Sequence, residues 1–370
     1  MKYMGSKRGM LGNGLGHLIE EHGSRCDRFL DLFSGSGAVS WFAAQQLQKP
    51  VHAFDLQAYA ATLAKAVVAR TTRLSFAALV KRWWEPAVER TKTEATGIAA
   101  TNLDTSHPPI QEWSATARRL CRTQDGGVIW KAYGGHYFSP RQAAMIDALI
   151  TELPAEEPER SACLAAVILA ASRTVAAPGH TAQPFQATST AGQYLEEAWQ
   201  LDVGHYAKEA LRGLVGRHAR VRGKATVKDA AQAAIQAQHG DLVFVDPPYS
   251  AVQYSRFYHV LETIATGRCG QVTGVGRYPV PSKRPSSLFS QVTHAADALE
   301  LVLEELAHAG CTVLLTFPAQ KCSNGLSGTA VIEMASDLFR ISRQEVVSNF
   351  STLGGNGHGR DARQKHPELI

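Results

Sequence analysis

Short apolar runs alternate with amphipathic stretches near the start of the chain. Residues 28–33 and 51–55 are apolar segments that each include an acidic residue near their end, and they predict two buried strands. A Gly/Ser-rich turn occupies 34–37, and the apolar spacing predicts helices over 38–47 and 58–70. This succession of strand, glycine turn, helix, strand and helix is typical of a parallel sheet with crossover helices.

The same pattern returns in the last third of the chain. Residues 242–246 form a nearly continuous apolar run, as expected for a strand that is buried on both faces. A second such run covers 312–317, helical spacing covers 295–309 and 331–339, and 345–350 fits a further strand. The two α/β segments therefore predict one sheet that is completed late in the sequence.

The intervening residues 73–221 have a different pattern, which is mainly helical with polar links. Helix cores are expected at 145–153 and 164–171, and polar links at 118–126 and 178–193. The segment is long enough to form a domain of its own. We therefore expect an α/β fold in which residues 1–72 and 222–370 form one domain and 73–221 form a mainly helical inserted domain.

Composition narrows the class of protein. The chain of 370 residues is 45% hydrophobic and 19% charged, which favours a folded protein, and its formal net charge of +5 is compatible with a polyanionic partner. The N-terminal residues lack an apolar core, and no apolar run approaches the ~20 residues of a membrane span. The six cysteines form no C-x-x-C pair and no zinc pattern. We expect a cytoplasmic protein with neither a membrane partner nor a metal site.

The first candidate site is the turn Asp31-Leu-Phe-Ser-Gly35-Ser-Gly37. Glycines at a strand-to-helix turn let the backbone approach a ligand closely, and a helix N-terminus favours an anionic group. A dinucleotide-binding turn needs a third glycine where this chain has Ser40, which argues against an NAD-linked dehydrogenase. Asp55, at the end of the next predicted strand, could accept hydrogen bonds from a ribose diol. A plain tight turn and a strand-end aspartate remain the alternatives.

The second candidate site is Asp246-Pro247-Pro248-Tyr249, directly after a predicted buried strand. Open α/β sheets bind ligands at the carboxyl ends of their strands. Two successive prolines fix the backbone and remove two N–H donors, so the local carbonyls become rigid acceptors. Asp246 adds a carboxylate acceptor and Tyr249 adds a flat face for stacking. This arrangement could hold an exocyclic amino group on an aromatic ring, whereas the alternative is a Pro-rich turn.

Three segments together resemble the Dam-type, alpha-group DNA adenine methyltransferases. They are Lys2-Tyr-Met-Gly-Ser-Lys7, the glycine turn at 31–37, and Asp-Pro-Pro-Tyr at 246–249. Their order along the chain, with a long insertion before the last segment, is also that of the alpha group. The resemblance implies a Rossmann-like sheet that binds S-adenosylmethionine, and an inserted domain that recognises the target in double-stranded DNA.

The resemblance also implies roles for individual residues. Tyr3 and Lys7 would close over the cofactor, and Asp55 would hold its ribose. Asp229 would lie near the cofactor's adenine. The methionine part would be held by Asp31, Phe33, Gly35 and Gly37, and the target base by Asp246, Pro247, Pro248 and Tyr249.

A mechanism follows as a hypothesis. Asp246 and the carbonyl of Pro247 would accept the two amino protons of adenine and localise the nitrogen lone pair for direct attack on the methyl group. The base would be flipped out of the duplex and stacked on Tyr249. Tyr254 or Phe257 would cover its other face, unless these aromatic side chains belong to the core.

Several alternatives stay open at this point. Cytosine amino methyltransferases usually have Ser in place of Asp246, so adenine is favoured over cytosine, whereas RNA, a protein glutamine and an inactive DNA-binding subunit are further possibilities. Restriction or defence subunits are candidate partners. Basic residues cluster at 208–228 and in the later loop, where they could contact phosphates or simply be solvated. The loop residues are Arg268, Arg277, Lys283 and Arg284.

Overall fold

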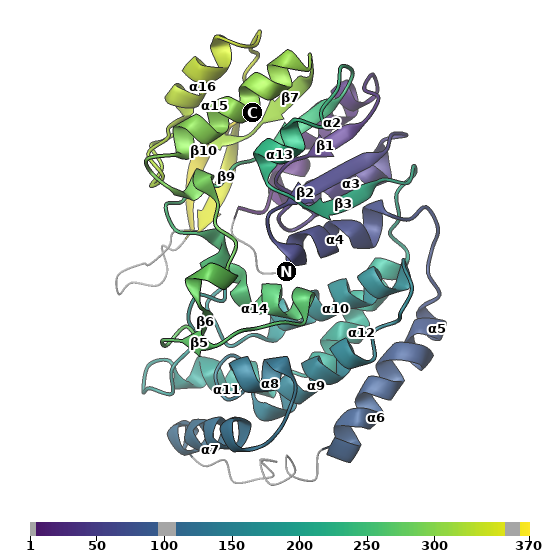
Figure 1. Cartoon of the computed structure of the whole chain (residues 1–370), viewed down its shortest axis with the longest axis vertical. Coiled ribbons are helices and arrows are strands. Elements are labelled where there is room, and N and C mark those ends of the chain that lie inside the picture. Colours follow the sequence, from purple (N-terminus) through teal and green to yellow (C-terminus); the bar gives the residue numbers. More distant parts are fainter. Residues whose placement is uncertain (1–4, 95–108, 352–362) are drawn as a thin grey trace. The chain divides into compact units, whose positions relative to one another are not determined.

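The computed structural model describes residues 5–94, 109–351 and 363–370, which form two compact units (Figure 1). The first, called the sheet unit, consists of the described residues within 3–72, 218–254 and 285–370. The second, called the helical unit, consists of those within 73–217 and 255–284. The predicted α/β fold with a mainly helical insertion is thereby confirmed.

The unit boundaries differ from the sequence-based division at 218–221, which belong to the sheet unit, and at one longer segment. Residues 255–284, expected in the α/β domain, belong to the helical unit. The reason is a set of buried polar contacts that local sequence pattern does not reveal. The Tyr133 hydroxyl lies 2.9 Å from Thr263 Oγ1, and the Tyr137 hydroxyl donates to the Gly276 carbonyl at 2.9 Å. The insertion into the sheet unit therefore occurs in two pieces.

The central sheet has five parallel strands in the order β3-β2-β1-β4-β7 (Figure 1). Their bounds are β1 Phe29–Asp31, β2 Val51–Asp55, β3 Lys224–Val227, β4 Leu242–Val245 and β7 Thr312–Leu315. Because β1 lies between β2 and β4, strands from both ends of the sequence meet at the centre of the sheet. All five carboxyl ends lie at one edge, where ligands bind in such folds.

Both faces of this sheet are covered, and the strand residues alternate between the two cores. Phe29, Leu242 and Phe244 face a cluster with helices α1–α4, whereas Leu30 and Val243 face a cluster with α13, α15 and α16. Burial on both faces explains the continuous apolar runs that predicted these strands. The helices are α1 Arg8–Leu11, α2 Leu15–Gly23, α3 Ala38–Gln46, α4 Ala58–Val68, α13 Ala230–Ala234, α15 Ala295–His308 and α16 Gly328–Ser336.

A three-stranded sheet of order β8-β10-β9 continues from the central one. Its strands are β8 Phe317–Pro318, β9 Glu345–Ser351 and β10 Arg363–Leu369. Only Thr316 separates β7 from β8, and β10 runs antiparallel to both of its neighbours. Glu368 on β10 is paired with Pro318, so this late strand reaches the carboxyl edge of the central sheet.

The helical unit contains most of the helices of the insertion and a small hairpin. One correction concerns 118–126, which was expected to be a polar link but lies largely in helix α7 (Ile110–Thr123). The helix forms because Trp113, Ala117 and Cys121 recur every four residues and are buried on one side. The other elements are α5 Phe76–Leu79, η1 Val80–Trp84, α6 Glu85–Glu94, α8 Val128–Tyr133, α9 Pro140–Thr151, α10 Glu159–Thr174, α11 Gly192–Gln200, α12 Val203–Val215, α14 Tyr254–Thr266, β5 Val272–Thr273, β6 Tyr278–Pro279 and η3 Pro281–Lys283.

Within the described part of the chain, no helix combines the length and the apolar character that crossing a membrane would need.

Candidate active site

Three aspartates lie at the carboxyl edge of the central sheet, each at the end of a different strand. Asp31 ends β1, Asp55 ends β2, and Asp246 directly follows β4. The register pairs Asp31 with Phe244 of β4 and with Ala53 of β2, so the three strands end at a similar level. The structure therefore brings together carboxylates from positions far apart in the sequence.

The glycine turn between β1 and α3 has a backbone that side chains disfavour. Gly35 has φ +48° and Gly37 has φ +75°, both in the left-handed region. A Cβ on Gly37 would lie 3.0 Å from Trp41 Nε1, so the helix that follows packs closely against this turn. The Ser34 N–H also donates to the Phe54 carbonyl at 2.9 Å. These contacts fix the turn beside the end of β2.

Asp31 is fully buried and is held by two donors. Ser40 Oγ donates to Asp31 Oδ2 at 2.5 Å, and the Phe33 N–H donates to Oδ1 at 3.3 Å. Burial raises the pKa of Asp31 to about 7 in spite of these hydrogen bonds. Ser40, which replaces the third glycine of a dinucleotide-binding turn, thus has a defined contact here. The Phe33 ring packs edge-on against Phe289, with centroids 5.1 Å apart.

Asp55 accepts hydrogen bonds from the turn and from the start of α4. Gly35 N–H donates to Asp55 Oδ2 at 2.8 Å, and Gln57 N–H donates to Oδ1 at 2.9 Å. Burial raises the pKa of Asp55 to about 6. Each carboxylate oxygen can accept a second hydrogen bond, so both still have capacity for a diol. The Asp55 side chain is therefore oriented by the glycine turn before any ligand arrives.

Asp229 lies near Asp55, although its own side chain is used locally. It precedes α13, where its carboxylate accepts the Ala231 N–H at 2.9 Å. The neighbouring Lys228 N–H donates to the Asp55 carbonyl at 2.9 Å. Asp229 therefore stands just beyond β3, at the same edge of the sheet as the other acids.

The segment Asp246-Pro-Pro-Tyr is anchored by an asparagine that sequence reasoning missed. Asn324 Nδ2 donates to the Pro248 carbonyl at 3.0 Å and to the Phe289 carbonyl at 3.1 Å. The Asn324 side chain is buried, so these bonds are shielded from water. The hydrogen bond that the Pro248 carbonyl accepts thus holds the loop in place.

Asp246 is held on one oxygen by two partners. Thr316 Oγ1 donates to Asp246 Oδ1 at 2.9 Å, and Lys7 Nζ lies 3.0 Å from the same oxygen. Thr316 is placed there because Val245 and Leu315 are register partners, so the next residue on each strand comes side by side. Neither of these contacts uses Oδ2.

Lys7 forms a second buried ion pair, with Glu368 of β10. Both side chains are at most 5% exposed, which makes this a desolvated cluster of one cation and two carboxylates. Burial alone lowers the pKa of the Lys7 ammonium, but the carboxylates of Asp246 and Glu368 together raise it above its ordinary value. Burial raises the pKa of Asp246 to about 6, with Lys7 opposing this shift and Glu368 adding to it.

The N-terminal segment Gly5-Ser6-Lys7 contacts both motifs. A Cβ on Gly5 would lie 3.0 Å from the Tyr249 hydroxyl, and Ser6 Oγ lies 3.5 Å from Ser36 Oγ in the glycine turn. Together with the Lys7–Asp246 pair, these contacts bring the three sequence motifs into one place. Tyr3, the other residue expected to close over a cofactor, lies outside the described residues.

The two aromatic side chains considered as a second cover differ in their surroundings. Burial, and then the neighbouring Tyr249, raise the pKa of the Tyr254 hydroxyl well above its ordinary value, which places this hydroxyl beside the Asp-Pro-Pro-Tyr segment. Phe257 is buried in the helical unit, where its ring lies 5.2 Å from that of His180. Tyr254 is therefore the aromatic residue associated with the sheet-edge site.

Sequence analysis missed three residues that contact the site: Thr316, Asn324 and Glu368. Only Thr316 carried a usable signal, because it interrupts an apolar run at the carboxyl end of a predicted strand. Glu368 depends on pairing between β10 and β8, which is a long-range contact without a local pattern. The elements β3, α13 and β10 were also not predicted. In the case of β3, the strand is short and mostly exposed.

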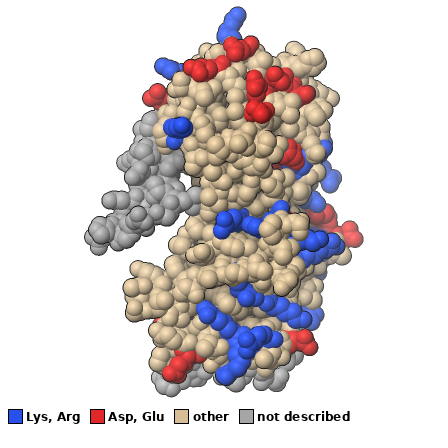
Figure 2. Space-filling model, turned by 60° about the vertical axis from the view of Figure 1, so that its left-hand side comes forward, with Lys and Arg blue, Asp and Glu red and all other residues tan. Residues whose placement is uncertain are grey.

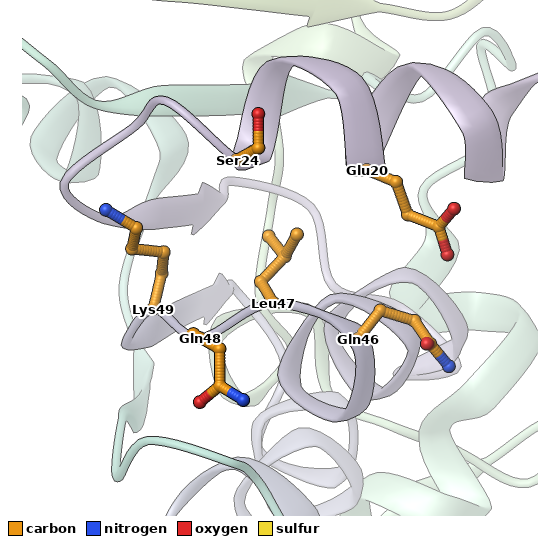
Figure 3. A pocket seen from close by; sticks show the side chains of 7 residues that line it. Glu20, Ser24, Gln46, Leu47, Gln48 and Lys49 are labelled. Carbon is orange, nitrogen blue, oxygen red and sulfur yellow. The ribbon is translucent and has the colours of Figure 1, made fainter.

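A surface pocket occurs elsewhere in the sheet unit, between the end of α2 and the loop before β2 (Figure 3). Its lining includes Glu20, Ser24 and the segment 46–49, so it lies at the amino ends of the strands. Figure 3 shows the Lys49 and Glu20 side chains on different sides of Leu47, without a shared cluster of polar groups. The pocket contains none of the sequence motifs.

Comparison of the chain with known proteins identifies a family. Residues 3–92 and 175–300, more than half of the chain, match the family model of D12 class N6 adenine-specific DNA methyltransferases. The chain is 24% identical to "Modification methylase LlaI" of Lactococcus lactis subsp. lactis over 269 residues, which is 72% of this chain and 38% of the relative. It is 24% identical to "Type II methyltransferase M.FokI" of Planomicrobium okeanokoites over 323 residues, 82% of this chain and 43% of the relative.

The chain thus spans about two fifths of the length of these curated relatives. The family match covers the N-terminal segment, the glycine turn and the Asp-Pro-Pro-Tyr segment, which are the parts that meet at the sheet edge. The chain belongs to the family of D12 class N6 adenine-specific DNA methyltransferases.

Proposed function

We propose that this protein transfers a methyl group from S-adenosylmethionine to the exocyclic amino nitrogen of adenine in double-stranded DNA. The observation that carries the proposal is the placement of Asp246. Its carboxylate follows a central strand, is held on Oδ1 by Lys7 and Thr316, and has Oδ2 outside those two contacts. An acceptor fixed in this way suits an amino group that must be bound and oriented.

The residues at the edge of the sheet fit S-adenosylmethionine as the methyl donor. Asp31 is buried and Asp55 is partly buried, and burial raises the pKa of both carboxyl groups. A ligand that carries both a cationic amino acid part and a ribose would supply a cation and a diol for them. Asp31, Phe33 and the glycine turn would hold the methionine part, Asp55 the ribose, and Asp229 would lie near the adenine. Lys7, with Tyr3, would close over the bound donor.

The base would be held by the Asp-Pro-Pro-Tyr segment. S-adenosylmethionine, when bound, supplies an electrophilic methyl group. Asp246 Oδ2 and the Pro247 carbonyl would accept hydrogen bonds from the amino group of adenine. These bonds would localise the lone pair on the amino nitrogen and orient it toward the methyl group. Pro248 would keep these two acceptors in place, because its carbonyl accepts a hydrogen bond from Asn324. Tyr249 would stack on the flipped base, with Tyr254 as its neighbour.

The finer assignments rest on the sequence motifs. Asp rather than Ser at position 246 supports adenine over cytosine as the target. The motif order, with most of the inserted helical unit between the glycine turn and Asp246, supports a place in the Dam-type alpha group. The helical unit would then select the target sequence. The net charge of +5 accords with a polyanionic substrate.

The names of the two relatives support a biological setting. One is called a modification methylase and the other a type II methyltransferase, terms that belong to restriction and modification. We propose that this protein methylates DNA in a restriction-modification or defence setting, with a cognate restriction or defence subunit as its candidate partner.

The deciding experiment is methyl transfer from labelled S-adenosylmethionine to unmethylated duplex DNA, followed by digestion to nucleosides and mass spectrometry. We expect the label on N6-methyl-2′-deoxyadenosine. Label on cytosine would keep the fold and the donor but overturn the role given to Asp246. Absence of transfer to DNA from a protein that binds the donor would exclude DNA as the substrate, and RNA and protein would be tested next.

A further inference from the structure

Two arginines of the helical unit converge on one tyrosine ring. The guanidinium carbon of Arg256 lies 4.9 Å from the centroid of the Tyr278 ring, and that of Arg284 lies 5.6 Å from it. The Tyr278 hydroxyl donates to the Ala182 carbonyl at 2.5 Å, which fixes the ring. The ring thus serves as a rigid platform that holds two cations close together.

The positive charge of this arginine pair is not neutralised inside the described part of the protein. Neither Arg256 nor Arg284 forms an ion pair with an acidic side chain there. Arg284 Nε is buried and has no hydrogen-bond partner among the described residues. Burial, and then the charge of Arg256, lower the pKa of Arg284, as expected for two like charges that repel each other. Cation–π contact lowers this cost but leaves the net charge in place.

The structure separates this pair from the other basic residues of the same loop. Arg277 is used internally, because its guanidinium donates to the backbone carbonyls of Ala132 and Lys131. Arg268 and Lys283 are exposed and have no contact with the Tyr278 ring among the described interactions. Of the cluster recognised in the sequence, only Arg284 is paired with a second arginine on a fixed platform.

We propose that Arg256 and Arg284, held on Tyr278, form a clamp for a backbone phosphate of the DNA substrate. A phosphate brings the negative charge that the pair lacks, and its oxygens match the planar donors of guanidinium groups. Lys and Arg gather over the helical unit on the face shown in Figure 2, which would favour the approach of a polyanion. A phosphate contact positions the duplex without reading its sequence. The inference rests on the proposed function, because it takes DNA as the ligand.

The test compares DNA binding by wild-type protein and variants over a range of salt concentrations. In Arg256→Ala/Arg284→Ala we expect the slope of log K against log[salt] to become shallower by about 0.9, the loss of one phosphate contact. The two single substitutions should be non-additive, since both side chains hold the same phosphate. Arg268→Ala is the matched control, because it removes an exposed charge from the same loop and should change the slope much less.

The outcomes are distinct. A double variant with the wild-type salt slope, or an Arg268→Ala slope as shallow as that of the double variant, overturns the clamp. Should Arg284→Ala fail to fold, the exposed Arg256→Glu and Arg268→Glu give the same comparison, with only the first expected to weaken binding strongly. Wild-type protein that binds the duplex but transfers no methyl group overturns the proposed function and leaves the clamp standing. Wild-type protein that does not bind the duplex overturns both.

Discussion

Lys7 and Glu368 form a buried ion pair although 361 positions separate them in the chain. The same ammonium group lies 3.0 Å from Asp246, so a single cation links the start of the chain, the Asp-Pro-Pro-Tyr segment and strand β10. The charges of Lys7, Asp246 and Glu368 interact through a low-dielectric interior, where electrostatic effects are large. This relationship gives the clearest test of how Asp246 is tuned.

Substitution of the two partners should move the acid limb of the pH profile in opposite directions. Activity should fall below about pH 6, because Asp246 has a pKa of about 6 and must be ionised to accept an amino proton. Lys7→Met removes a cation that lowers the pKa of Asp246, so the limb moves to higher pH. Glu368→Gln removes an anion that raises this pKa, so the limb moves to lower pH. The measurement is kcat/KM against pH.

Glu345→Gln is the control for this pair, because it removes an exposed acid from the adjacent strand β9. Its profile should match the wild type. Shifts of the two test variants in the same direction would contradict the proposed coupling. Since breaking a buried ion pair is strongly destabilising, the folded fraction of each variant is checked by thermal melting before the assay.

Thr316→Val should slow catalysis without weakening donor binding. The substitution keeps the shape of a fully buried side chain but removes the hydroxyl that donates to Asp246 Oδ1. A lost hydrogen bond to a charged group is worth about 1.5 kcal/mol, so we expect kcat to fall about tenfold. Thr316→Ser restores the hydroxyl and should recover most of the rate. Equal rates for the Val variant and the wild type would show that the contact has no role in positioning Asp246.

Asp246→Ala should abolish methyl transfer while leaving donor binding largely intact. The reason is that Asp246 is assigned to the amino group of the target base rather than to the donor. Asp229→Ala is a matched contrast and should raise the KM for S-adenosylmethionine with little loss of kcat. Steady-state kinetics and calorimetric titration with the donor separate the two effects. A near-normal rate in the Asp246 variant would refute the mechanism.

The contribution of Asp31 to the stability of the ligand-free protein should fall as pH rises from about 4 to about 7. The pKa of Asp31 is about 7 in the folded protein and 3.8 in its ordinary state, so the folded state binds more protons in this window. That stabilisation is complete below the lower value and is lost as pH rises through the upper one. Asp31→Asn should flatten this dependence, whereas Asp337→Asn, at an exposed position, should not. Denaturant unfolding at several pH values gives the comparison, and a slope in the Asp31 variant equal to that of the wild type would count against it.

The candidate site at the carboxyl edge of the central sheet was largely predictable because its residues lie in local patterns. β2 begins and ends where the apolar run predicted, and Asp31, Asp55 and Asp246 stand at strand ends as expected. The parallel order then requires these ends to meet. Asp246 was recognised from four consecutive residues, so no long-range contact was needed to find it.

The residues that hold Asp246 in place were not predictable in the same way. Thr316 and Glu368 act through strand pairing across the sheet, and Asn324 acts through carbonyls of two segments that are far apart in the sequence. Segment 255–284 joins the helical unit through buried tyrosine hydroxyls, which a local pattern of apolar residues cannot reveal. Sequence therefore indicated the groups that would do chemistry more readily than the groups that orient them.

The late position of strand β10 in the sequence also affects the order in which the chain can fold during synthesis. At roughly 5–20 residues per second, the ribosome needs about 20–70 s to add the 361 positions between Lys7 and Glu368. β1 lacks its neighbour β4 until residue 245 has been added, and Lys7 lacks its partner Asp246 until the next residue and its partner Glu368 until almost the end. Helices of the insertion are synthesised before β3 and β4, and they can begin to pack while the central sheet is still incomplete. The Lys7–Glu368 ion pair is therefore one of the last contacts of the site to form, and a truncated chain that stops before residue 368 would lack it.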